Sequence, residues 1–234
     1  MLTGQNSIDD LGYLENVARK IEPNSYNEAK MAYGMIAAIK GDVDGVYRQF
    51  NAAIMNSGHD PQVLSNFSAA LLNIQKTKDA IAAMDKAIEV APDDPNFLFI
   101  AIDTNLKAFN IEGAKKFRDQ LSKLIEIPHD FDESFTMKSE FISQLLEANG
   151  ATWIDIANRL DFVGRELHNQ ENKLRFVTQS YCDDSIVFSF VLDADVEEAV
   201  KAEGLLHEKI ASLPFSPADT VVAFSCEPYE RTAN

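Results

Sequence analysis

The sequence predicts an α+β protein, with an N-terminal α-α superhelix of paired helices followed by a small three-stranded antiparallel α+β domain. Phe50–Ile54 is echoed 34 residues later by Met84–Ile88, and both segments are followed by an Asp-Pro turn. That spacing is the length of one helix–turn–helix repeat. From residue 174 on, helical periodicity gives way to runs rich in β-formers. We therefore expect two domains, residues 1–150 and 151–234.

The composition is that of an acidic protein with enough apolar residues for a large core. The chain has 234 residues, of which 46% are hydrophobic, and a formal net charge of −16 at pH 7. Such a charge repels phosphate backbones and anionic membranes, so we expect no nucleic-acid or membrane partner. No basic segment precedes an apolar run near the N-terminus, and no window approaches about 18 apolar residues. We expect neither a signal peptide nor a membrane span, which favours the cytoplasm.

Turn residues divide the first part of the chain into consecutive helices. Pro61 and Pro95 each open a helix, at a position where the missing N–H costs little. Glu22–Ser25 separates the first two helices, Gly41-Asp42 ends the second, and Thr152 begins a capping box before the last. The expected helices span residues 8–20, 26–40, 43–55, 61–75, 77–91, 95–109, 110–127, 132–148 and 152–168.

The clearest helix pair, counted from Pro61 as position 1, resembles a tetratricopeptide repeat. Its matches at positions 8, 20, 24, 27 and 32 are Ser68, Ala80, Met84, Ala87 and Pro92. The units that start at Asn27 and Pro95 are degenerate versions, so the resemblance covers residues 26–128. It implies a stack of three helix pairs, because one pair cannot bury its apolar face alone.

The resemblance also implies a binding site, since the first helix of each pair lines a concave groove in tetratricopeptide proteins. The groove of this chain would be largely apolar and suited to an amphipathic helix or hydrophobic peptide of a partner protein. The alternative, to which we give equal weight, is that the C-terminal domain of the same chain fills this groove. We expect the partner to contact Met31, Met35, Ser65, Leu72, Asn73, Phe99 and Leu106. The remaining groove positions are Glu28, Ala38, Ile39, Gln62, Ala69, Asn96, Asp103 and Lys107.

The C-terminal segment is expected to form a hairpin, a helix and a further strand. The strands are Leu174–Cys182, Ser185–Leu192 and Thr220–Cys226, and the helix runs from a cap at Asp195 to Leu213. This order is similar to that of a ferredoxin-like unit without its first strand. Such a sheet has an open edge, through which two copies of the chain could form a homodimer.

No catalytic or metal-binding arrangement is recognisable in the sequence. The aspartates at 183, 184, 193 and 195 fit turn and cap chemistry, and the four histidines are scattered. Cys182 and Cys226 fit ordinary buried thiols. We expect no catalytic residue, no metal and no cofactor.

Protein–protein interaction is the function that these features favour, as an adaptor, a chaperone-like holder or an assembly factor. One alternative is a helical domain that regulates a C-terminal domain with enzymatic or nucleic-acid-related activity. In that case Asp193, Tyr181 and Glu227 would converge in an open cleft. The other alternative is a self-assembling structural protein.

Overall fold

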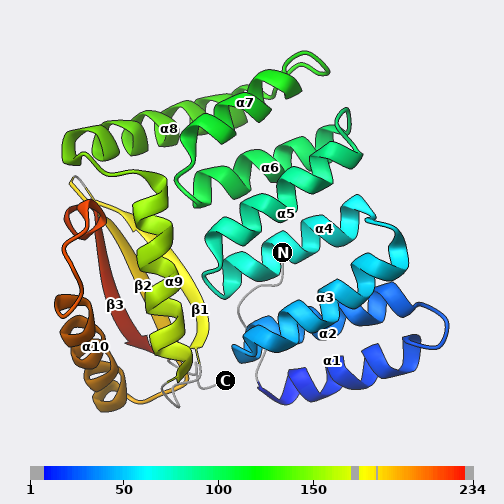
Figure 1. The fold of residues 1–234 in the computed structure, drawn as a ribbon, viewed down its shortest axis with the longest axis horizontal. Coiled ribbons are helices and arrows are strands. Elements are labelled where there is room, and N and C mark those ends of the chain that lie inside the picture. Colours follow the sequence, from blue (N-terminus) through cyan, green and yellow to red (C-terminus); the bar gives the residue numbers. More distant parts are fainter. Residues whose placement is uncertain (1–7, 170–173, 183, 230–234) are drawn as a thin grey trace. The chain divides into compact units, whose positions relative to one another are not determined.

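The computed structural model describes residues 8–169, 174–182 and 184–229, which form two compact units. Met1–Asp132 is called the helical unit and Glu133–Asn234 the sheet unit (Figure 1). Helix α8 (His129–Asn149) begins in the first and continues into the second. The sequence predicts two domains that meet between residues 150 and 151. The division into compact units does not test whether either part folds alone, so this boundary stays a prediction.

The helical unit is a run of paired antiparallel helices, consistent with a helical repeat region. Helix α1 packs on α2, and the next pairs are α2 with α3, α4 with α5 and α6 with α7 (Figure 1). The helices are α1 (Ile8–Ile21), α2 (Tyr26–Lys40), α3 (Val43–Ser57), α4 (Pro61–Asn73), α5 (Thr77–Val90), α6 (Pro95–Lys107) and α7 (Ile111–Leu121). Each was expected at nearly these bounds, except that α7 ends earlier, at a cap formed by Ser122.

The turn inside each helix pair repeats with a period of 34 residues. Gly41, Gln75 and Phe109 have positive φ angles of 71°, 61° and 60°. In each turn, the residue that follows the one with positive φ donates its N–H to the carbonyl of the residue five positions earlier in the chain, at 2.8–2.9 Å. The third pair, whose sequence pattern is degenerate, therefore has the same turn as the other two.

Gly41→Ala is expected to destabilise the helical unit by about 1 kcal/mol, because a Cβ is strained in the left-handed region. Gly12 lies exposed inside α1, and a Cβ at this position would meet no described atom within 4 Å. Gly12→Ala should instead stabilise by up to about 1 kcal/mol, since it only raises helix propensity. Urea unfolding followed by circular dichroism at 222 nm checks both; equal shifts for the two variants would contradict the turn geometry.

Small residues let the paired helices approach closely, as the repeat resemblance implies. A Cβ on Gly34 of α2 would lie 2.4 Å from the ring of Phe50 on α3. In the next pair, the Ser68 hydroxyl donates to the Ala80 carbonyl at 2.8 Å, and both residues are fully buried. These contacts fix the spacing of α2 on α3 and of α4 on α5.

The first residues of α8 continue the stack. His129 follows Pro95 by 34 residues, as Pro95 follows Pro61. The Arg118 guanidinium on α7 donates to both carboxylate oxygens of Asp132, at 2.7 and 3.0 Å. These hydrogen bonds and the neighbouring charge raise the pKa of Arg118.

The sheet unit is built around a mixed three-stranded sheet. Its elements are α9 (Trp153–Asn169), β1 (Leu174–Tyr181), β2 (Ile186–Leu192), α10 (Val196–Ala211), the 3-10 turn η1 (Pro217–Thr220) and β3 (Val222–Pro228). The strand order is β1-β2-β3, with β1 antiparallel and β3 parallel to β2. The expected purely antiparallel sheet is wrong, because β3 is parallel to β2, whereas the expected order of helix, strand, strand, helix and strand is confirmed.

The direction of β3 follows from its connection. Helix α10 crosses over between β2 and β3 and returns the chain to the starting end of β2. A strand that follows such a crossover is parallel to the strand before it. An antiparallel sheet would have required β3 to pair with β1 instead. Strand β2 is central and covered on both faces, because every residue from Phe188 to Leu192 is buried.

Candidate functional site

The first helices of the three pairs lie side by side, as the repeat resemblance implies. Helix α4 packs against α2 on one side and α6 on the other (Figure 1). The Asn66 side-chain amide on α4 donates to the Met31 sulfur on α2, at 3.2 Å. We call the solvent-facing side chains of these helices the α2–α4–α6 surface.

The residues expected to bind a partner differ in how accessible they are. Met31, Met35, Leu72 and Phe99 are partly exposed, and Asn73 is exposed. Ser65 and Leu106 are buried in the helical unit, with exposed fractions of 3% and 8%. These two side chains shape the surface from beneath and do not reach its exterior.

Phe99 is engaged by the chain itself. Its ring meets the ring of Phe131 edge to face, with centroids 4.9 Å apart. Phe131 lies in the first turn of α8, at the end of the helical unit. At the third helix pair, the predicted surface is therefore covered in part by the following helix, and its open apolar portion lies on α2 and α4.

Besides the exposed row Glu28, Gln62 and Asn96, two further rows of residues spaced by 34 are accessible on the surface. One row is Met35, Ala69 and Asp103, and the other is Ile39, Asn73 and Lys107. In both rows the α2 residue is partly exposed and the α4 and α6 residues are exposed. Asp103 and Lys107 form an ion pair at 2.6 Å. Ile39 and Ala69 were groove positions in the sequence pattern, and their exposure favours them over Ser65 and Leu106.

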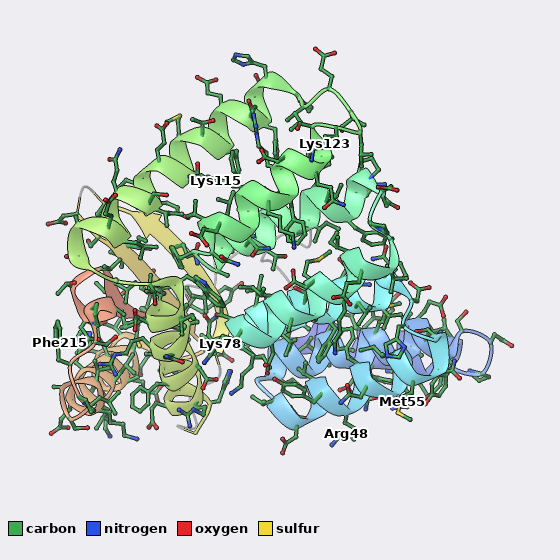
Figure 2. The ribbon with its side chains drawn as sticks, turned by 45° about the horizontal axis from the view of Figure 1, so that its top comes forward. Arg48, Met55, Lys78, Lys115, Lys123 and Phe215 are labelled. Atoms are coloured by element: carbon green, nitrogen blue, oxygen red, sulfur yellow. The ribbon has the colours of Figure 1, made fainter. Side chains whose placement is uncertain are left out.

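Basic side chains project from the second helices of the pairs. Figure 2 shows Arg48 on α3, Lys78 on α5, Lys115 on α7 and Lys123 just after it, and all four are exposed. At Met35, Ile39, Leu72 and Asn73, the α2–α4–α6 surface is by contrast apolar or amide in character.

No family model, curated protein or solved structure matches this chain. The paired helices α1–α7 are consistent with a helical repeat region. The surfaces that these helices present are therefore the basis for proposing a function.

The cleft expected for an enzymatic C-terminal domain is not formed by the residues named for it. Tyr181 pairs with Ile186 at the hairpin end of the sheet, whereas Asp193 and Glu227 lie near Leu192 at the other end. The length of β2 places those ends about 20 Å apart. Asp195 accepts the Glu198 N–H in a capping box, as expected for a helix cap. Within the described ranges, no cluster of three or more histidine, cysteine or acidic side chains could hold a metal ion.

The two cysteines differ in environment, and the expectation that both are buried is wrong for one of them. Cys182 is exposed after β1. Cys226 is buried in β3, and burial, with a smaller contribution from the nearby Glu203 carboxylate, raises the pKa of its thiol to about 12. Cys226 is therefore a poor nucleophile at neutral pH.

No helix in the described part of the chain has both the length and the apolar character needed to cross a membrane.

Proposed function

We propose that the helical unit is a tetratricopeptide-like module that binds a helix or hydrophobic peptide of a partner protein. The single observation that carries this proposal is the adjacency of α2, α4 and α6, with partly exposed apolar side chains on their common surface. Stacked repeats present such surfaces for binding. A partner with an apolar face would remove these side chains from water.

The α2–α4 portion of the surface has the chemistry that such a partner needs. Met35, Ile39 and Leu72 offer apolar contact, and methionine adapts its shape to different ligands. Asn73 is exposed beside Leu72 and can donate to and accept from a peptide backbone. The partner would therefore lie across α2 and α4, since the ring of Phe131 already packs against the ring of Phe99 on α6.

Leu72→Glu is expected to lower the recovery of bound partner at least about tenfold, because it places a charge in the apolar contact. The measurement is affinity capture of the full chain from source lysate, with bound proteins quantified by mass spectrometry. Met55→Glu is the matched control, since Met55 on α3 is 84% exposed and lies outside the surface. An unchanged circular dichroism spectrum shows that both variants are folded.

The proposal is wrong if folded Leu72→Glu captures the same proteins in the same amounts as the wild type. It is also wrong if Met55→Glu causes an equal loss, because the effect would then follow added charge and not position.

A further inference from the structure

The outer edge of β3 in the sheet unit carries backbone groups that β2 does not use. The Ile186 N–H donates to the Val221 carbonyl at 2.9 Å, and the Tyr229 N–H donates to the Leu192 carbonyl at 2.7 Å. Because successive residues of a strand direct their backbone groups to opposite sides, Val222, Phe224 and Cys226 direct theirs to the open edge. This edge is distinct from the surface proposed above, which belongs to the helical unit.

Side chains of α10 already bond part of this edge. The Glu203 carboxylate accepts the Cys226 N–H at 2.8 Å, and His207 Nε2 lies 2.9 Å from the Phe224 carbonyl oxygen. These contacts block strand pairing toward the end of β3. Among the residues that the structure describes, none is seen to bond the outward N–H and C=O of Val222.

A pocket of about 440 Å³ opens at this unbonded part of the edge. It is lined by Val222, Ala223 and Phe224, whose side chains alternate between the sheet faces, so it lies against the strand edge. Ile210, Leu213 and Phe215 form its apolar wall. Phe215 is 75% exposed, and Figure 2 shows it at the outer margin of the sheet unit.

The charge around the edge identifies the kind of occupant. The segment from residue 196 to 228 has six acidic side chains and two basic ones, and one of the basic pair, Lys209, is bonded to Glu166. The acidic residues are Glu197, Glu198, Glu203, Glu208, Asp219 and Glu227, of which Asp219 is paired with Arg159 and Glu203 is bonded to the Cys226 N–H. A second copy of this chain, with its formal charge of −16, would be repelled. A cationic segment would be attracted.

We propose that the β3 edge binds an extended, basic peptide segment of another protein by strand addition. The peptide backbone would pair with the N–H and C=O of Val222, and one apolar side chain would enter the pocket beside Phe215. Its lysine or arginine side chains would be attracted by the net negative charge of the chain. Main-chain pairing gives such complexes affinity, and the side-chain pocket gives them specificity.

The test uses the full chain and a fluorescein-labelled heptapeptide of alternating lysine and valine with a central phenylalanine, followed by fluorescence anisotropy. We expect saturable binding that weakens as salt rises, because the attraction is partly electrostatic. Phe215→Ala should raise the Kd about tenfold or more, whereas Phe215→Leu should nearly restore the wild-type value. Met55→Ala, which removes an even more exposed apolar side chain from the helical unit, should leave the Kd unchanged.

Two peptide controls separate strand addition from simple charge attraction. The same peptide with glutamate in place of lysine should not bind. The lysine peptide with N-methyl groups on alternate amides should bind at least about tenfold more weakly when the methylated edge faces β3, because it cannot donate to the Val222 carbonyl. Leu72→Glu should bind the labelled peptide like the wild type, so this test and that of the proposed function fail independently.

The proposal is overturned if the lysine peptide shows no binding at about 1 mM, the weak limit for a specific contact. Equal binding by the N-methylated peptide, or no effect of Phe215→Ala, also overturns it. If light scattering shows that Phe215→Ala converts a dimer into a monomer, the edge joins two copies and the peptide assignment is wrong.

Discussion

Asp219→Ala is expected to destabilise the sheet unit by about 3–5 kcal/mol, because it leaves a buried guanidinium without its counter-charge. Arg159 on α9 is 7% exposed and donates to both Asp219 oxygens, at 2.6 and 2.7 Å. It also donates to the Pro214 carbonyl at 2.7 Å. The pair thus ties α9 to the segment that leads into β3.

Urea unfolding monitored by tryptophan fluorescence measures this effect, because the single tryptophan, Trp153, lies at the start of α9 in the same unit. Arg159→Met combined with Asp219→Ala should recover part of the loss, since the double variant buries no unpaired charge. If the loss in free energy of unfolding of the double variant equals the sum of the losses of the two single variants, the ion pair does not act as a coupled unit.

The same ion pair predicts a loss of stability in acid. Burial raises the pKa of the Asp219 carboxyl, but the hydrogen bonds from Arg159 and the Ser216 N–H outweigh burial and hold it below its ordinary value. A lowered folded-state pKa stabilises the protein above the unfolded pKa of about 4, and this contribution disappears as pH falls through the folded value. Asp219→Asn should therefore flatten the decline in the midpoint of Trp153 fluorescence unfolding below about pH 4.

Phe50→Ala is expected to destabilise the helical unit by about 3–5 kcal/mol, as for other fully buried phenylalanines. Phe50 is completely buried, and its ring is stacked on Phe67 with centroids 5.1 Å apart. The loss is measured from circular dichroism at 222 nm during urea unfolding. Tyr13→Ala, at a side chain 68% exposed on α1, is the control and should shift stability by less than about 0.5 kcal/mol.

The close approach of Gly34 to Phe50 gives this prediction a second test. Gly34→Ala alone should cost about 1–3 kcal/mol, because its Cβ would overlap the Phe50 ring. In the Phe50→Ala background the ring is gone, so the same substitution should cost little. Additive effects of the two substitutions would contradict the packing of α2 on α3.

The helices could be predicted from the sequence because local signals determine them. Pro61 and Pro95 begin helices as expected, and Asp60 and Asp94 cap them by accepting N–H groups at 2.7 and 2.8 Å. The repeat pattern also places α2, α4 and α6 next to one another. By contrast, the positive φ angles of Gln75 and Phe109 in the turns could not be predicted, because neither residue type favours a positive φ.

Features that depend on long-range contacts could not be derived in this way. Arg159 and Asp219 are 60 residues apart, and no local pattern links them. The parallel pairing of β3 could have been inferred from the apolar run Ile186–Val191, which is typical of a central strand, and from the expected helix after it, since a central strand followed by a helical crossover requires a parallel neighbour. The sequence pattern also could not separate the exposed Asn73 from the buried Ser65, because both occupy groove positions of one helix.

Site-specific photo-crosslinking tests the central claim, partner binding on α2 and α4, most directly. A p-benzoylphenylalanine residue is introduced in place of Asn73 on the surface, or in place of Met55 on α3, and the full chain is irradiated in source lysate. We predict a discrete crosslinked protein from position 73, mapped by mass spectrometry to one apolar segment of that partner, and none from position 55. The claim is contradicted if position 73 yields no adduct above the level seen at position 55.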